Sequence, residues 1–257
     1  MERILYEHIR NLFSPEMISQ SQHAYMKGRS VDTALHNSVR IIESSLEHNQ
    51  YTLASFLDIE GAFKNITLDA IVNSLIRIRV DNSVCQWISL MLRSREINSK
   101  VGESSLTRYV TRGTPQGGVL SPLLWLLVVN TILLEIGSIG IKAVAYADDV
   151  VLLVLGLFLN ILSERMQLGL CTLFKWAVSC GLRIHPLKTE LVLFRRGYTT
   201  PTFRLPSLNC LVLGLSTKAN FLGVILVQRL TWRENLEERV KKAQVAFSVC
   251  QKAIGKT

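Results

Sequence analysis

Two adjacent aspartates, Asp148 and Asp149, precede five consecutive apolar residues in the stretch YADDVVLLV (146–154). Desolvating an unpaired carboxylate is costly, so acidic side chains are rarely buried unless they are paired or bind a cation. Two carboxylates this close repel each other unless a cation bridges them, and hard oxygen ligands suit Mg²⁺. The alternative is a solvated hairpin turn, where aspartate is common, and the pair alone favours that alternative.

A third carboxylate, Asp58, lies near the end of the apolar run YTLASFLDIE (51–60), where an acid has little structural purpose. The run predicts a buried strand that Gly61 closes. If this strand lies beside the aspartate hairpin in one sheet, three carboxylates on adjacent strands could hold two metal ions about 3.5–4 Å apart. Asp58 could instead cap the helix that follows Gly61.

The elements that must position these carboxylates follow from hydrophobic spacing. Strands of a hairpin are expected at 142–146 and 150–154, and a second hairpin around 97–111 has its turn at 103–105. Ser121 is a plausible N-cap, with Pro122 in the first turn of an apolar helix. Helices are also predicted at 1–13, 31–46, 67–79, 84–93, 159–177 and near the C-terminus, with short strands at 190–194 and 221–226. This order predicts an α+β fold, an antiparallel sheet backed by helices.

Composition narrows the class of protein. With 48% hydrophobic residues the chain can bury a large core, and its net charge of +9 suits either a polyanionic partner or ordinary solubility. Five cysteines without a CxxC pair predict no zinc site and no disulfide-linked partner, which fits an intracellular location. The apolar stretch 119–136 is interrupted by Ser121-Pro122 and Asn130, so a buried core helix is expected rather than a membrane span.

Five motifs occur in the order and approximate spacing of the reverse transcriptase palm motifs: ASFLDIEGAF, GTPQGGVLSPLL, YADDVVLL, GLRIHPLKTELVLF and FLGVIL. The sequence resembles the reverse transcriptases of non-LTR (LINE-type) retrotransposons, of the insect jockey-like kind. Each motif alone is a weak signal, but five in order are highly specific, and the resemblance covers nearly the whole chain. It implies a polymerase palm at 51–218 with a helical fingers-type insertion at about 65–112, partial fingers at 1–50, and the primer grip and start of a thumb at 219–257.

The resemblance also implies a metal site and a reaction. Asp58, Asp148 and Asp149 would hold two Mg²⁺ ions, for which Mn²⁺ could substitute, with the Ile59 carbonyl as a backbone ligand. The chain would be an RNA-directed DNA polymerase, with an RNA template, a DNA primer and dNTPs as its partners. The primer 3′-hydroxyl would attack the α-phosphate of the dNTP and release pyrophosphate, helped mainly by metals and positioning.

Four further residues match nucleotide-binding positions of the family. Phe63 stands at the steric-gate position, where an aromatic ring excludes a ribose 2′-hydroxyl; RNA polymerases with a similar palm typically carry a small or polar residue there. Gln116 and Gly117 match a loop that lies against the nascent base pair, although a plain helix-entry turn is the alternative. Lys188 matches a lysine near the nucleotide phosphates, and an exposed strand-end lysine is an equal alternative.

The remaining matches concern nucleic acid. Leu222 and Gly223 fall in the motif that resembles the primer grip, where an edge hairpin is the alternative. Lys27 and Arg29 match template-strand phosphate contacts, or belong to a solvated basic loop. Residues 228–257 carry seven Lys/Arg and three Asp/Glu, which suits salt-sensitive, sequence-independent duplex contacts as well as a solvated amphipathic helix.

The sequence departs from the family pattern without losing a metal ligand. By the resemblance it begins downstream of the basic fingers segment, and we expect no endonuclease before it and no zinc knuckle or full thumb after it. Lys64 stands where an aspartate is usual, and His185, Asn220 and Val227 stand where Asn, Lys and Asp are usual. We therefore expect a truncated copy of an element. The alternative to an active polymerase is an inactive remnant that only binds nucleic acid.

Overall fold

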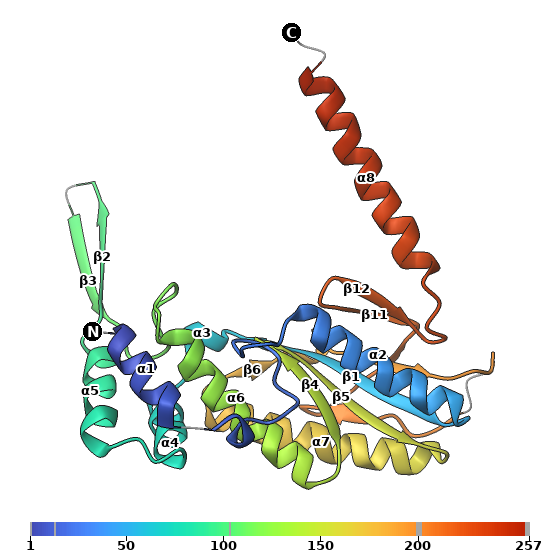
Figure 1. Cartoon of the computed structure of the whole chain (residues 1–257), viewed down its shortest axis with the longest axis horizontal. Coiled ribbons are helices and arrows are strands. Elements are labelled where there is room, and N and C mark those ends of the chain that lie inside the picture. Colours follow the sequence, from blue (N-terminus) through green and yellow to red (C-terminus); the bar gives the residue numbers. More distant parts are fainter. Residues whose placement is uncertain (1, 13, 103, 199–201, 255–257) are drawn as a thin grey trace.

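The computed structural model describes residues 2–12, 14–102, 104–198 and 202–254, and a central sheet organises them (Figure 1). Within these residues the sheet has six strands, in the order β10-β7-β1-β5-β4, with β6 paired to the end of β1. The pairings are antiparallel except that of β10 with β7. The strands are β1 (Tyr51–Glu60), β4 (Lys142–Tyr146), β5 (Asp149–Gly156), β6 (Arg183–Ile184), β7 (Glu190–Phe194) and β10 (Leu215–Ser216).

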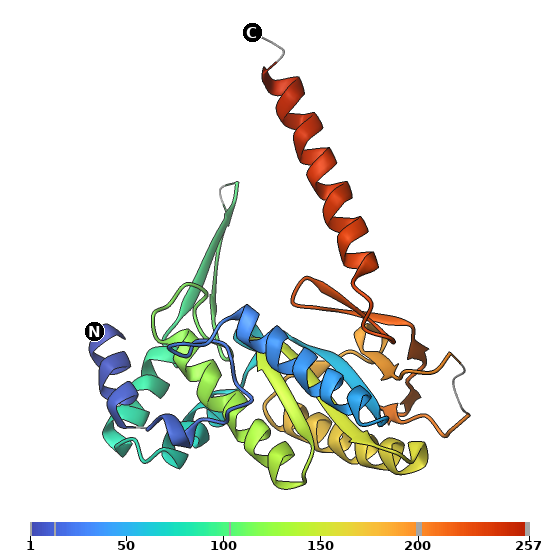
Figure 2. The ribbon, with the colours of Figure 1, turned by 45° about the vertical axis from the view of Figure 1, so that its right-hand side comes forward.

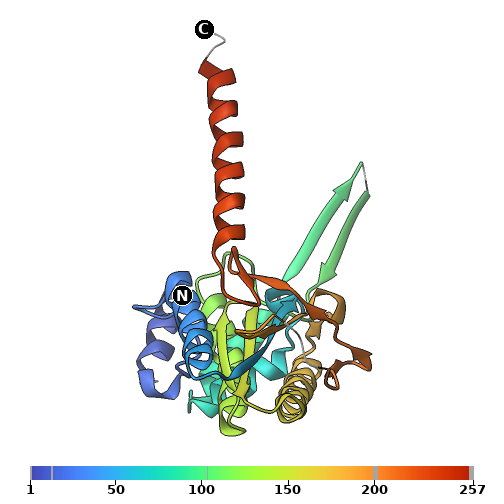
Figure 3. The same ribbon diagram turned by 90° about the vertical axis from the view of Figure 1, so that its right-hand side faces the viewer.

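Helices cover both faces of this sheet, so the predicted α+β architecture is confirmed (Figures 1 and 3). The helix α2 (Val31–Glu47) packs on one face, while α6 (Ser121–Ser138) and α7 (Leu159–Ser179) pack on the other. Side chains alternate along β1: Leu53 and Leu57 belong to the α6–α7 core, whereas Ala54 and Phe56 belong to the core on the α2 side. This period-two alternation is what a strand buried on both faces requires.

The elements beside the sheet include three predicted helices and the predicted hairpin, together with two 3₁₀ turns and a second hairpin that the sequence did not predict. They are α1 (Glu2–Leu12), α3 (Ala62–Asn65), α4 (Leu68–Arg77), α5 (Asn82–Arg93), two short 3₁₀ turns (Pro15–Met17 and Pro186–Lys188), and the hairpins β2 (Glu96–Val101) with β3 (Ser104–Tyr109) and β8 (Ser207–Leu208) with β9 (Leu211–Val212). The β2–β3 hairpin extends from the body (Figure 2). Its predicted turn includes Glu103, and the first predicted helix includes Met1 and Phe13; these three residues lie outside the described residues.

The helix α6 begins differently from the prediction that Ser121 is its N-cap. Leu120 is the N-cap and has no side-chain capping bond, whereas Ser121 lies inside the helix with Pro122 in the first turn. The Ser121 hydroxyl donates a hydrogen bond to the Pro115 carbonyl (2.7 Å), and the free N–H of Val119 donates to the Glu2 carboxylate (2.8 Å). The Glu2 carboxylate, from a helix far away in the sequence, thus lies at the N-terminus of α6, where the helix dipole favours negative charge. The local sequence could not reveal this contact.

The apolar character of α6 follows from its position in the core. Its side chains are buried on nearly every side, against α4, α7 and β4. By length and composition alone α6 could cross a bilayer, but 67% of that window is buried inside the molecule. The folded chain therefore uses this apolar surface for its own packing.

The C-terminal part of the chain also differs from the prediction. The strand predicted at 221–226 is a hairpin of β11 (Lys218–Phe221) and β12 (Val224–Val227) that turns at Leu222 and Gly223, both with positive φ. The predicted C-terminal helix is confirmed as α8 (Arg233–Ile254), which extends away from the body (Figure 3). Apolar side chains along this helix are exposed, with Leu236 at 65% and Phe247 at 64%.

Candidate active site

Strand pairing brings the three predicted carboxylates together. Asp58 and Asp149 are direct register partners across β1 and β5. By the alternation of each strand, both lie on the face of the sheet that α2 covers. Asp148 occupies the hairpin turn between β4 and β5, and its backbone carbonyl accepts a hydrogen bond from the Ile59 N–H (3.1 Å). The three residues therefore lie at the same end of the sheet, where Asp58 and Asp149 are paired across β1 and β5 and Asp148 lies in the adjoining turn.

Asp58 does not cap the helix that follows it. The short helix α3 has Gly61 as its N-cap, with φ 72° and no side-chain capping bond. This finding excludes the capping alternative for Asp58, whose partly exposed carboxylate is close enough to Asp149 for its charge to act on that residue.

The carboxylate cluster carries surplus negative charge. Burial, together with the neighbouring charges of Asp148 and Asp58, raises the pKa of Asp149 from 3.8 to about 6. Within the described residues, the ion pairs at this cluster are those of one cation, Lys188, whose ammonium lies 3.7 Å from Asp58 and also pairs with Glu60. The Lys188 ammonium also donates a hydrogen bond to the Glu60 carboxylate, and this bond is the main reason for the raised pKa of Lys188.

The residues present fit a divalent cation. In the part of the chain that the structure describes, no three Asp, Glu, His or Cys side chains form a ready-made cage. Asp58 and Asp149 are nevertheless paired side by side, and the pKa of Asp149 is raised because burial and the charges of Asp148 and Asp58 oppose its ionisation. Mg²⁺ characteristically binds one or two carboxylates and completes its shell with water and substrate phosphates.

Phe63 belongs to a row of aromatic rings beside the aspartate turn. Its ring meets Tyr25 edge-on at 6.4 Å between centroids and lies 5.9 Å from the ring of Trp125. The Trp125 indole N–H donates to the carbonyl of Ala147, in the aspartate turn (2.9 Å). Burial and, to a lesser extent, the charge of Asp148 raise the pKa of Tyr25.

Sequence reasoning did not single out Tyr25 or Trp125. A tryptophan within an otherwise aliphatic helix was the available signal for Trp125, because a buried indole N–H needs an acceptor.

The loop that contains Gln116 and Gly117 is attached to α3. The Gly113 N–H donates to Ile66 O and the Thr114 N–H donates to Phe63 O, both at 2.7 Å. A Cβ on Gly113 would lie 2.5 Å from two backbone oxygens of α3, so only glycine allows this approach. These backbone bonds fix the loop next to Phe63. Gln116 and Gly117 lie at its exposed turn.

The segment that contains Lys27 and Arg29 lies against the aspartate hairpin. His23 N–H donates to Ala145 O, and Ala145 N–H donates to Ser21 O, both at 2.8 Å. The Arg29 guanidinium donates to the carbonyls of Ser19 (3.0 Å) and Gln22, so it stabilises this segment from within. Lys27 is exposed and has the freer side chain for a phosphate contact.

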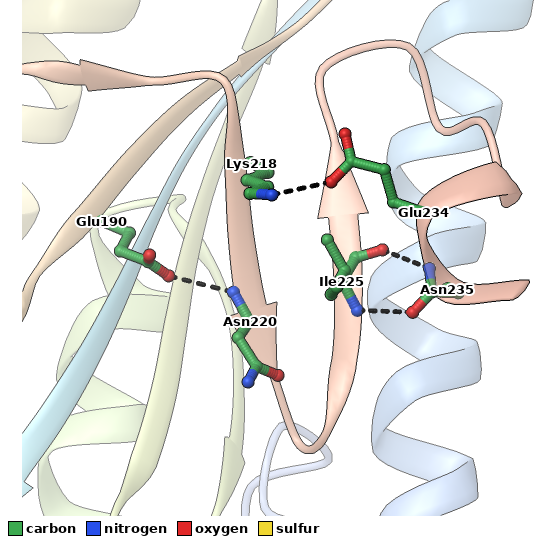
Figure 4. Close-up of polar contacts among 6 residues, drawn as sticks. All are labelled: Glu190, Lys218, Asn220, Ile225, Glu234 and Asn235. Atoms are coloured by element: carbon green, nitrogen blue, oxygen red, sulfur yellow. Dashed lines mark hydrogen bonds and ion pairs between the residues drawn. The ribbon is translucent and has the colours of Figure 1, made fainter. Parts of the chain in front are cut away.

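The β11–β12 hairpin reaches the carboxylates from the other side. A cavity of about 60 Å³ is lined by Asp58, Asp149, Lys188 and Asn220, among others. The Asn220 N–H donates to the Glu190 carboxylate of β7 (3.0 Å), which ties the hairpin to the sheet (Figure 4).

The same hairpin is joined to α8 (Figure 4). The Asn235 side chain accepts from the Ile225 N–H (2.7 Å) and donates to the Ile225 carbonyl (2.5 Å), and Lys218 pairs with Glu234 (2.9 Å). The hairpin that turns at Leu222 and Gly223 is thus bonded to the sheet on one side and to α8 on the other.

Comparison with known proteins finds a matching family and relatives from transposable elements. The sequence model of the family described as reverse transcriptase (RNA-dependent DNA polymerase) matches residues 1–226. The RNA-directed DNA polymerase from mobile element jockey of Drosophila melanogaster is 23% identical over 90% of this chain and 26% of its own length. The retrovirus-related Pol polyprotein from type-1 retrotransposable element R1 of Bradysia coprophila is 25% identical over 91% of this chain and 23% of its own length. The chain spans about a quarter of the length of the curated relatives it matches.

Solved structures show the same fold. Apo telomerase of Candida tropicalis, truncated from its C-terminal domain, superposes with a TM-score of 0.61 at 13% identity, covering 90% of this chain and 43% of that one. Telomerase of Candida albicans in complex with a fragment of telomeric RNA gives a TM-score of 0.59 at 13% identity, covering 88% and 37%. The palm-like fold expected from the sequence is therefore confirmed.

Proposed function

The chain belongs to the reverse transcriptase (RNA-dependent DNA polymerase) family, and from this membership we propose that it copies an RNA template into DNA by Mg²⁺-dependent nucleotidyl transfer. The observation that carries the proposal is the register pairing of Asp58 with Asp149, which sets two carboxylates side by side next to Asp148. Surplus negative charge at a rigid sheet end, without a ready-made cage, suits metal ions that the substrate phosphates help to bind.

In this proposal Asp58, Asp148 and Asp149 hold the metal ions, and the Ile59 carbonyl adds a backbone ligand. When bound, Mg²⁺, or Mn²⁺ in its place, would make the primer 3′-hydroxyl a better nucleophile and stabilise charge on the leaving pyrophosphate. The chain's own contribution is to hold the carboxylates in place: the β1–β5 ladder fixes two of them, and the Ile59 N–H fixes the turn that carries the third. Such preorganisation reduces the entropic cost of bringing the reactants together.

The dNTP would lie between α3 and the loop that follows Arg112. Phe63 would contact its sugar and exclude a 2′-hydroxyl, and the exposed turn at Gln116 and Gly117 would face the nascent base pair. Lys188 would exchange its partners Asp58 and Glu60 for the phosphates once metal ions neutralise the acids. An exposed lysine can make this exchange readily, because surface ion pairs contribute little to stability.

Nucleic acid would run along the same face. The Leu222–Gly223 turn would hold the primer end, Lys27 would contact the template backbone, and Arg29 would support that segment. Residues 1–50 would serve as partial fingers, 51–218 as the palm with an insertion at about 65–112, and 219–257 as primer grip and start of the thumb. These ranges include residues 1, 13, 103, 199–201 and 255–257, which lie outside the described residues.

Primer extension tests the proposal. The purified chain is given an RNA template with a DNA primer, dNTPs and Mg²⁺, and DNA synthesis is expected. Asp148→Ala keeps the backbone bond to Ile59 and should reduce synthesis more than about a hundredfold, as loss of a transition-state contact does. Asp69→Ala is the matched control, because Asp69 is an exposed aspartate on α4, and it should retain wild-type synthesis. Full activity of Asp148→Ala would refute the mechanism.

Primer extension, combined with a measurement of duplex binding, distinguishes this proposal from its alternatives. Salt-sensitive binding to an RNA–DNA duplex without incorporation in Mg²⁺ or Mn²⁺ would identify an inactive remnant that only binds nucleic acid. Preferential incorporation of rNTPs would indicate an RNA polymerase and would contradict the role of Phe63 as the gate.

A further inference from the structure

Trp125 makes two contacts that connect otherwise separate parts of the site. It is buried in α6, with 1% of its surface exposed. Its indole N–H donates a hydrogen bond to the carbonyl of Ala147, at 2.9 Å, and its ring lies 5.9 Å from the ring of Phe63. The first contact holds the turn of the aspartates, and the second supports the ring at the gate position.

The turn needs such support. Ala147 has φ 55°, in the left-handed region that residues with a Cβ rarely occupy. Backbone strain of this kind persists only where surrounding contacts determine the conformation. The Ile59 N–H holds the turn through the carbonyl of Asp148 (3.1 Å), and the Trp125 indole holds it through the carbonyl of Ala147.

The contact with Phe63 extends the connection. The Phe63 carbonyl accepts the N–H of Thr114, from the loop that carries Gln116 and Gly117. One side chain therefore lies between the carboxylate turn and the elements proposed to hold the nucleotide. A phenylalanine could fill the space beside Phe63, but it has no N–H for the turn, so the indole does more than fill the core.

We propose that Trp125 is a positioning residue, which fixes the turn carrying Asp148 and Asp149 relative to the ring of Phe63. Its indole N–H sets the geometry of the carboxylates and thereby kcat, while its ring sets the position of the Phe63 gate and thereby the preference for dNTPs over rNTPs. The effect on catalysis rests on the proposed polymerase function; the effect on the turn does not.

Trp125→Phe removes the N–H and keeps an aromatic ring. Loss of the hydrogen bond to the carbonyl of Ala147 should lower kcat about tenfold, while KM for dNTP changes less than about twofold. Trp125→Leu should additionally reduce the selectivity for dNTPs over rNTPs, because Phe63 then loses its neighbouring ring.

Trp176→Phe is the matched control. Trp176 is also buried, and its indole N–H donates to the Thr131 hydroxyl (3.0 Å), which joins α7 to α6 away from the carboxylates. This variant should show a similar fall in Tm but wild-type kcat. Equal kcat in the two phenylalanine variants would overturn the catalytic part of the proposal.

A measurement that does not depend on activity completes the test. In the NMR spectrum of the ¹⁵N-labelled protein, Trp125→Phe should shift the backbone amide signals of residues 147–149, and Trp176→Phe should leave them in place. Unmoved signals in Trp125→Phe would overturn the positioning role. If these signals move but the wild-type chain makes no DNA, the positioning role stands and the proposed polymerase function fails.

Discussion

The raised pKa of Asp149 predicts that replacing this residue increases the stability of the metal-free protein but abolishes its function. In Asp149→Asn a neutral amide of similar shape replaces the carboxylate beside Asp58 and Asp148. DNA synthesis should be lost, because a metal ligand is removed. The metal-free protein, in contrast, should become more stable at neutral pH, because the carboxylate is ionised there at a cost that burial and two neighbouring charges impose.

The size and sign follow from linkage. The folded protein holds the Asp149 proton more tightly than the unfolded chain does, since its pKa rises from 3.8 to about 6 on folding. The stability that this proton contributes is complete below the unfolded pKa and is lost as the pH rises through the folded pKa. Two pKa units correspond to about 3 kcal/mol, an upper value for a side chain that water partly reaches.

Urea unfolding, followed by circular dichroism in EDTA, measures this effect. The free energy of unfolding of Asp149→Asn minus that of the wild type should grow by up to about 3 kcal/mol between about pH 4 and pH 7.5. Asp81→Asn, an exposed aspartate before α5, is the control and should show a constant difference. Mg²⁺ with dNTP should narrow the gap at neutral pH, because the cations offset the acids in the wild type alone. A gap that does not change with pH would refute the electrostatic reasoning.

Three further predictions concern the surroundings of the carboxylates. Gly113→Ala, whose Cβ would lie 2.5 Å from backbone oxygens of α3, should lower the free energy of unfolding by about 2–4 kcal/mol in urea titrations, whereas Gly117→Ala, with φ 85° but open space, should cost about 1 kcal/mol. Lys188→Met should raise KM for dNTP about tenfold in steady-state primer extension and leave Tm nearly unchanged, because its pair with Glu60 is exposed; an unaltered KM would exclude the phosphate contact. Asn235→Ala, which removes both hydrogen bonds between α8 and β12, should weaken duplex binding measured by fluorescence anisotropy and lower stability by about 1–2 kcal/mol; unchanged binding would separate α8 from the duplex.

Local patterns predicted most of the elements because each pattern has one main structural solution. The spacing of apolar residues gave α2, α4, α5 and α7, and the run 51–60 gave β1 with its bounds. The failures occurred where a loop or a turn, rather than the spacing of apolar residues, decided the outcome. Ser121 was wrong as an N-cap because it bonds to the loop before α6, and the strand predicted at 221–226 was wrong because its centre turns at Leu222 and Gly223.

The sequence by itself determined the chemistry that this protein carries: three acids at strand ends, an aromatic residue at a set distance from the first, a glycine-rich loop, and the family to which they belong. Only the tertiary structure decided how these groups meet. It paired Asp58 with Asp149, used the Arg29 guanidinium inside the fold, and set Trp125 between Phe63 and the carbonyl of Ala147. The physical reason is that a two-residue period fixes which side chains share a face of a strand, but the neighbouring strand, its register and the contacts of a buried side chain depend on packing between residues far apart in the chain.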